Sequence, residues 1–193
     1  MSEKKDILLV AIGDSITYGY PYLPSQSWVN IVKERFNIKV FNKGINGNTT
    51  EQMLIRFPYD CLNLNPTHVT IMGGANDAFM GIGVESVLEN ISKMVELAEE
   101  KGIIPVIGLP TPVVTTYEEN LLASYRDKIR KLAESRGLAT IDFYTPFMED
   151  GKVREELFDD EAHPNINGYE IMGEAAYNDL KLVFARYIFA NNN

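Results

Sequence analysis

Five short apolar runs, separated by longer stretches of helical periodicity, constrain the fold of this 193-residue chain most strongly. The first run, Ile7 to Gly13, shows no helical stripe, which is typical of a strand buried on both faces. The other four runs lie at residues 38–42, 68–72, 103–109 and 138–143. Strands that alternate with helices in this way form a parallel sheet covered on both faces.

We therefore predict one α/β domain over residues 1–193, a three-layer α/β/α sandwich around a five-stranded parallel sheet. By analogy with flavodoxin-like folds, we expect the strand order 2-1-3-4-5. Apolar residues at helical spacing predict helices over residues 28–36, 50–57, 84–101, 118–136 and 167–190. Ser27 is suited to cap the first of these helices, and residues 144–159 are predicted to be mostly loop.

The charge and composition of the chain exclude several classes of partner. With 18 basic and 27 acidic residues the net charge is -9, and such a field repels phosphates, so we predict no binding to nucleic acid. No apolar run approaches the roughly 20 residues that span a bilayer, so we expect no integral membrane contact. The lone cysteine, Cys61, excludes an intramolecular disulfide and a Cys-rich metal site. The polar segment Met1–Asp6 leaves no room for a signal peptide, which predicts a cytoplasmic location.

Polar residues follow the first three predicted strands. Asp14 and Ser15 end the first run abruptly, which places Ser15 at a tight strand-to-helix corner where a nucleophile is often presented. The same two residue types are equally common as helix caps. Gly47 and Asn76 follow the second and third strands. Because the carboxyl ends of parallel strands meet at one edge of a sheet, we expect Ser15, Gly47 and Asn76 to lie at the same edge.

A nucleophilic serine needs a base within hydrogen-bonding reach, and usually an acid that orients this base. The chain contains two histidines, and His68 is expected to be structural because it begins the third strand, at the opposite edge of the sheet. His163 follows the fifth strand and is therefore the candidate base. Asp160, three residues earlier, can accept a hydrogen bond from Nδ1 and leave Nε2 free for Ser15. Asp159 is a second candidate for this acid.

Hydrolysis of an ester also requires hydrogen-bond donors for the oxyanion that develops in the transition state. The N–H groups of Ser15 and Gly47 and the side-chain amide of Asn76 are suitable donors from three neighbouring corners. Taken singly, Gly47 is better interpreted as a turn glycine and Asn76 as a turn or cap residue. Their occurrence together with Ser15 and His163 favours a catalytic site.

These residues lie in four short blocks that resemble those of the SGNH, or GDSL-type, esterases and lipases. The blocks are Gly13-Asp-Ser-Ile16, Asn46-Gly-Asn-Thr49, Gly74-Ala-Asn-Asp77 and Asp160-Glu-Ala-His-Pro164. The resemblance implies Ser15 as nucleophile, Asp160 and His163 as orienting acid and base, and Ser15, Gly47 and Asn76 as the oxyanion hole. Two positions differ from the family pattern: Ile16 replaces Leu, and Glu161-Ala162 stands where Gly is frequent.

The resemblance implies a serine esterase that acts on small-molecule acyl esters, most simply short-chain or O-acetyl esters, and requires no metal or organic cofactor. Asp14, Tyr18, Phe79 and Val113 are predicted to contact the substrate. Three alternatives remain open: a lysophospholipase or thioesterase with the same site, a non-catalytic flavodoxin-like module that binds phosphate or flavin, and a catalytically idle relative. The motifs determine neither the acyl-chain length nor the oligomeric state.

Overall fold

The computed structural model describes residues 7–191 and contains a five-stranded parallel sheet. The strands are β1 (Leu8–Gly13), β2 (Lys39–Gly44), β3 (His68–Met72), β4 (Ile104–Leu109) and β5 (Ala139–Asp142). Their order is β2-β1-β3-β4-β5, so the predicted fold class and strand order are confirmed. The segment Met1–Asp6, on which the expected location depends, lies outside the described residues.

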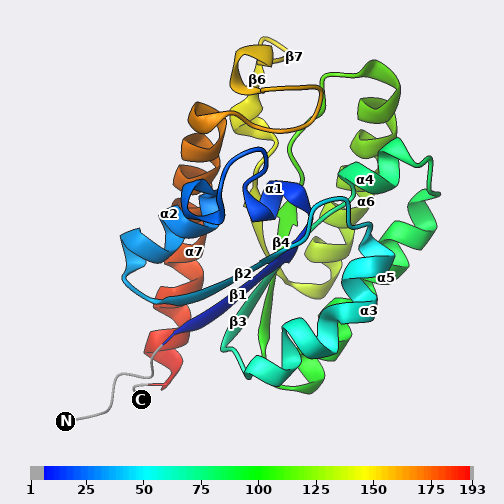
Figure 1. Ribbon diagram of the computed structural model, residues 1–193. Helices are drawn as coiled ribbons and strands as arrows, with labels where there is room; N and C mark the ends of the chain where they lie inside the picture. The colour runs from blue at the N-terminus through cyan, green and yellow to red at the C-terminus, as the bar shows by residue number, and fades with distance from the viewer. Residues whose placement is uncertain (1–6, 192–193) are drawn as a thin grey trace.

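Helices cover both faces of the sheet (Figure 1). On one face lie α2 (Trp28–Phe36) and α7 (Ile166–Asn191), and on the other lie α3 (Thr50–Asp60), α5 (Val84–Glu100) and α6 (Thr116–Arg136). As predicted, the Ser27 side chain caps α2 by accepting a hydrogen bond from the Asn30 N–H. None of the described helices combines the length and apolar character needed to cross a membrane.

Two apolar cores fill the spaces between the layers. Because successive side chains of a strand point to opposite faces, Val10 and Ile12 of β1 pack toward α3, α5 and α6, whereas Leu9 and Ala11 pack toward α2 and α7. Every residue of β3 is buried, as expected for a central strand of a parallel sheet. Apolar side chains therefore cover both faces of the sheet, and polar groups gather where the strands end.

The structure contains short elements that the periodicity did not predict. These are α1 (Ser15–Tyr18) and α4 (Ala75–Phe79), the antiparallel strands β6 (Met148–Glu149) and β7 (Lys152–Val153), and four 3₁₀ turns, η1 (Pro24–Gln26), η2 (Leu62–Leu64), η3 (Thr145–Phe147) and η4 (Glu155–Leu157). Each spans five residues or fewer, too short for a repeating apolar pattern. Helix α3 also continues past the predicted end at residue 57, because the Cys61 N–H donates to the Phe57 carbonyl and closes a further turn.

Candidate active site

Ser15 is the first residue of α1, at the carboxyl end of the central strand β1. The corner is tight: a Cβ on Gly13 would lie 2.0 Å from Thr17 Oγ1 and 2.7 Å from the Met72 carbonyl oxygen, so glycine is required there. The Asp14 side chain caps the helix by accepting a hydrogen bond of 2.9 Å from the Ile16 N–H. Asp14, and not Ser15, is therefore the helix cap, and the Ser15 hydroxyl is free for another partner.

That partner is His163. Ser15 Oγ lies 2.9 Å from His163 Nε2, although 148 residues separate the two in the chain. On the other side of the ring, His163 Nδ1 lies 2.8 Å from Asp160 Oδ2 and 3.0 Å from Asp160 Oδ1. The structure thus joins the three predicted side chains in one hydrogen-bonded series.

The charge of Asp160 determines which atoms donate and which accept in these hydrogen bonds. Burial by itself would raise the pKa of Asp160, but hydrogen bonds from the Ala162 and His163 backbone amides and from the His163 ring outweigh it, and the net pKa is lowered. Asp160 is therefore a carboxylate near neutral pH and can only accept. In the neutral form of the ring, this acceptor places the proton on Nδ1, so that Nε2 has the lone pair to which the Ser15 hydroxyl can donate.

The loop that carries His163 is closed and anchored at several points. The Asp159 N–H donates to the His163 carbonyl at 2.9 Å, and the Val114 N–H donates to the Glu161 carbonyl at 2.7 Å. Asp159, the second candidate for the orienting acid, does not contact the ring in this structure. Its Oδ2 instead accepts a hydrogen bond of 2.5 Å from the Tyr22 hydroxyl.

Gly47 lies in the turn that follows β2. The Asn48 N–H donates to the Ile45 carbonyl at 3.2 Å, and Gly47 has a φ of +79°, the arrangement of a type II turn whose third residue favours glycine. Within residues 7–191 the N–H groups of Gly47 and Ser15 donate no hydrogen bond. The Asn76 side-chain amide donates to the Asn48 carbonyl at 3.0 Å, which joins the Gly47 turn to the corner after β3.

A cavity of about 240 Å³ lies at this edge of the sheet. Its lining combines the hydrogen-bonded side chains with small apolar groups, and the residues are Ser15, Ile16, Ala75, Asn76, Phe79, Asp160, Glu161, Ala162 and His163. Gly47 is not among them and is connected to the cavity through Asn48 and Asn76. The cavity thus brings a serine hydroxyl, a histidine ring and a side-chain amide beside an apolar wall, which are the types of group that acyl transfer requires.

The four residues predicted to contact the substrate have different surroundings. Phe79 lines the cavity and is 45% exposed. Asp14 is only 1% exposed, and burial raises its pKa to about 6, although the Ile16 hydrogen bond and the nearby His163 lower it. Val113 is fully buried, and Tyr18 is half-buried at the end of α1. Asp14, Tyr18 and Val113 do not line the cavity, so their contact with substrate stays a prediction.

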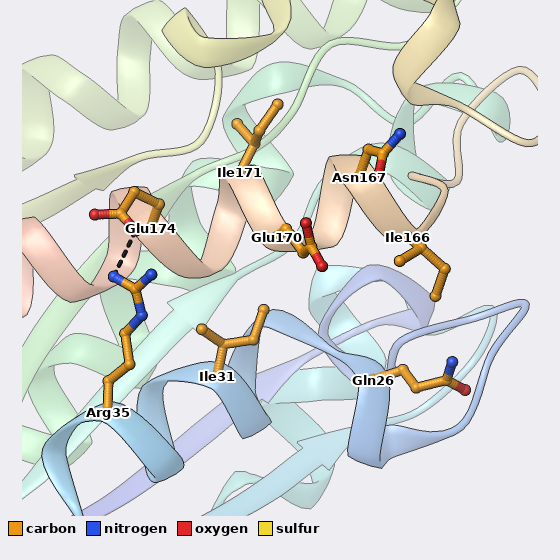
Figure 2. Close-up of a pocket in the computed structure, with 8 residues that line it drawn as sticks. All are labelled: Gln26, Ile31, Arg35, Ile166, Asn167, Glu170, Ile171 and Glu174. Atoms are coloured by element: carbon orange, nitrogen blue, oxygen red, sulfur yellow. Dashed lines mark ion pairs between the residues drawn. The ribbon is translucent and has the colours of Figure 1, made fainter.

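A larger cavity, of about 700 Å³, lies between α2 and α7 (Figure 2). Figure 2 shows Arg35 of α2 and Glu174 of α7 joined by an ion pair across it. None of its eight lining residues is a serine, cysteine or histidine, so this groove has no counterpart of the Ser15–His163 pair. Among residues 7–191, no group of three or more His, Cys, Asp or Glu side chains is placed to hold a metal ion.

The sequence did not predict the supporting roles of three side chains, although Tyr20 and Tyr22 were candidates for an apolar acyl pocket. Tyr20 packs against the His163 ring, Tyr22 holds Asp159, and Arg56 of α3 hydrogen-bonds to Asn48 beside Gly47. Tyr20 and Tyr22 belong to an aromatic loop, which has no periodicity to interpret. The one available signal for Arg56 was its position between the apolar residues Met53 and Phe57, where a charged side chain needs buried partners.

Comparisons with known proteins identify the family of this chain. Residues 11–171 match the GDSL-like Lipase/Acylhydrolase family. The thioesterase 1/protease 1/lysophospholipase L1 of Escherichia coli K12 is 30% identical over 166 residues, which cover 83% of this chain and 76% of that enzyme. A Desulfitobacterium hafniense structure assigned to the G-D-S-L lipolytic family superimposes with a TM-score of 0.83 at 35% identity, covering 90% of this chain and 99% of that one.

The chain therefore belongs to the GDSL-like lipase/acylhydrolase family, and its class is that of the carboxylic ester hydrolases. The predicted family and enzyme class are confirmed. Another relative is named as a lipoprotein, YqeF of Bacillus subtilis, and is 35% identical over 119 residues. The match covers 55% of this chain and about half (49%) of that protein.

Proposed function

We propose that the protein hydrolyses small carboxylic esters through an acyl-enzyme on Ser15. The observation that carries this proposal is the series in which Ser15 Oγ lies 2.9 Å from His163 Nε2, while His163 Nδ1 lies 2.8 Å from Asp160 Oδ2. A serine hydroxyl is a weak nucleophile by itself, and a base oriented by a carboxylate activates it.

In this mechanism Ser15 Oγ attacks the ester carbonyl carbon while His163 Nε2 accepts the hydroxyl proton. The tetrahedral intermediate collapses when His163 returns this proton to the leaving alcohol, and the acyl group stays on Ser15. His163 Nε2 then removes a proton from water as the water oxygen attacks the acyl carbon. The second tetrahedral intermediate collapses when His163 returns this proton to Ser15 Oγ, and the carboxylic acid leaves. Asp160 stabilises the imidazolium that forms in each half of the cycle, and no metal or cofactor takes part.

The developing oxyanion needs donors that are free before the substrate arrives. The Ser15 and Gly47 N–H groups have no acceptor within residues 7–191. The Asn76 amide lines the cavity beside Ser15, and because one of its two N–H groups donates to the Asn48 carbonyl, the second serves as the donor. We assign these three donors to the oxyanion hole. In the type II turn the N–H of the glycine points away from the turn's own hydrogen bond, which explains why Gly47 is available.

The size of the cavity favours a short acyl group. Its volume of about 240 Å³ is below the roughly 300–1,000 Å³ of pockets that enclose drug-sized ligands. Phe79, Ile16 and Ala162 supply apolar contacts suited to an acetyl or short acyl chain. A thioesterase or lysophospholipase activity is the second candidate, and the similarity to the Escherichia coli thioesterase 1/lysophospholipase L1 favours it.

Labelling with a fluorophosphonate tests the mechanism without a known substrate. The reagent should phosphonylate Ser15 stoichiometrically, with release of fluoride, and a peptide map should locate the adduct. Labelling should be absent in Ser15→Ala and much slower in His163→Ala. A panel of p-nitrophenyl esters should then show kcat/KM highest for short chains. No labelling of the folded wild-type protein would contradict the proposal, and a preference for long-chain esters or acyl thioesters would favour the second candidate.

A further inference from the structure

The guanidinium of Arg56 lies beneath the Gly47 turn and contacts three separate segments of the site's framework. Its Nη2 donates to the Gly13 carbonyl at 2.7 Å, at the end of β1, and its Nη1 donates to the Lys43 carbonyl at 2.9 Å, near the end of β2. Its Nε donates to Asn48 Oδ1 at 2.7 Å, within the turn region itself. The side chain is only 13% exposed.

Helix geometry explains how Arg56 reaches this position. Thr49 caps α3 directly after the turn, and Arg56 follows it by seven residues, or about two helical turns, so both lie on the same face. Side chains of a helix also lean toward its N-terminus. The long Arg56 side chain therefore extends back under the turn from which the helix starts.

Asn48 connects Arg56 to the candidate oxyanion donors through hydrogen bonds. While Asn48 Oδ1 accepts from Arg56, the Asn48 backbone carbonyl accepts from the Asn76 side-chain amide at 3.0 Å. The Gly13 carbonyl likewise accepts from both Arg56 and the Ile45 N–H, the latter at 3.1 Å. Arg56 is thus connected to both ends of the Gly47 turn. It contacts Asn48 directly, and it shares the Gly13 carbonyl with the N–H of Ile45.

We propose that Arg56 is a positioning residue, which fixes the Gly47 turn and the Asn76 amide relative to Ser15 so that the oxyanion hole is formed before substrate binds. This inference rests on the proposed acyl-enzyme mechanism. Arg56 itself does not touch substrate. A planar guanidinium is needed because its N–H groups point in several fixed directions at once, whereas a lysine ammonium is a single point charge. Asp60 accepts from Nη1 at 2.9 Å and neutralises the charge.

The test compares Arg56→Lys and Asn48→Ala with wild type, and uses Arg136→Lys as the matched control. Arg136 is also a partly buried, ion-paired arginine, but it ends α6 at the opposite edge of the sheet. On a short p-nitrophenyl ester, kcat of Arg56→Lys should fall about 10- to 100-fold at nearly constant KM, because a small misplacement of catalytic donors is costly. The kcat of Asn48→Ala should also fall, whereas Arg136→Lys should keep the wild-type kcat.

A boronic acid, which forms a tetrahedral adduct on a reactive serine, separates positioning from general stability. Its inhibition constant should rise in Arg56→Lys by about the same factor by which kcat/KM falls, since both depend on the oxyanion donors. The double variant Arg56→Lys/Asn48→Ala should lose little more than Arg56→Lys, because both changes break the same contact. Thermal unfolding is measured for every variant. If Arg56→Lys does not fold, the Asn48→Ala comparison decides.

The outcomes separate this inference from the proposed function. If wild type is labelled by a fluorophosphonate but both variants keep kcat and boronic acid affinity within about threefold, the positioning role is wrong and the mechanism stands. The positioning role is also overturned if kcat falls only in proportion to the folded fraction. If folded wild type is neither labelled nor active on any ester, the proposed function fails and the role of Arg56 falls with it.

Discussion

The rings of Tyr20 and His163 lie with their centroids 4.6 Å apart and their planes at 64°, an edge-to-face contact. The Tyr20 carbonyl accepts a hydrogen bond of 2.6 Å from the buried Tyr169 of α7, which anchors the loop that carries this ring. Two residues later, Tyr22 donates to Asp159 in the loop of His163. The loop after α1 therefore supports the position of His163 through two aromatic residues.

This contact predicts a role for the Tyr20 ring in holding His163. Tyr20→Ala should lower kcat on a short ester about 3- to 10-fold, because an edge-to-face aromatic pair contributes about 0.5–1.5 kcal/mol. Tyr20→Phe keeps the ring and the backbone carbonyl, so it should retain wild-type kcat. An equal loss in both variants would show that the hydroxyl, and not the ring contact, is what matters.

Removal of the Asn76 amide tests the oxyanion assignment. Asn76→Ala should lower kcat about 100-fold or more with little change in KM, since the donor acts on charge that appears only in the transition state. Steady-state kinetics on a p-nitrophenyl ester measures both parameters. A loss in kcat below about threefold would remove Asn76 from the proposed mechanism.

Replacement of the orienting carboxylate should be more severe. Asp160→Asn keeps an oxygen that can accept from the Ala162 and His163 backbone amides, so the loop should still fold. The neutral amide cannot stabilise an imidazolium, and it can donate to Nδ1 and leave the ring in the wrong tautomer. We expect kcat to fall by about a thousandfold or more. Asp159→Asn provides the comparison, and if it were the more damaging change, Asp159 would be the acid.

The second histidine makes stability depend on pH. His68 is fully buried between Phe184 and Tyr187, and burial lowers its pKa from 6.5 to about 4. Between these values the unfolded chain binds a proton that the folded protein does not. The free energy of unfolding should therefore decrease as pH falls from 6.5 to 4, by about 3 kcal/mol in total from this residue.

Urea unfolding at several pH values between 4 and 7 measures this effect. His68→Leu loses the contact between Nδ1 and Thr67 Oγ1 and also removes the buried Nε2, which has no hydrogen-bond partner within residues 7–191. The stability of this variant should depend less on pH than that of wild type. Thr67→Val keeps the histidine. It should change the free energy of unfolding by a similar amount at every pH, so the dependence of this free energy on pH should stay the same. An identical slope in His68→Leu and wild type would show that His68 does not cause the pH dependence.

The sequence was sufficient for the fold because its information is local and repetitive. Apolar runs such as Ile7 to Gly13 alternate with helical periodicity, and this alternation determines a parallel sheet. His163 was predicted to be the partner of Ser15 because it follows the fifth strand, whereas His68 lies at the opposite edge of the sheet, and the three-residue spacing predicted the contact of Asp160 with His163. The contact of Ser15 with His163 follows from the order of the strands, and the contact of Asp160 with His163 follows from their three-residue spacing.

Only the tertiary structure decided the supporting contacts. Arg56 contacts Gly13, Lys43 and Asn48 because α3 begins directly after the Gly47 turn. No pattern in the sequence specifies the direction in which α3 leaves this turn. The same holds for the Tyr20 ring against His163 and for the burial of Val113. Periodicity tells which face of an element is buried, whereas these contacts depend on loop paths and side-chain rotamers set by packing across the whole domain.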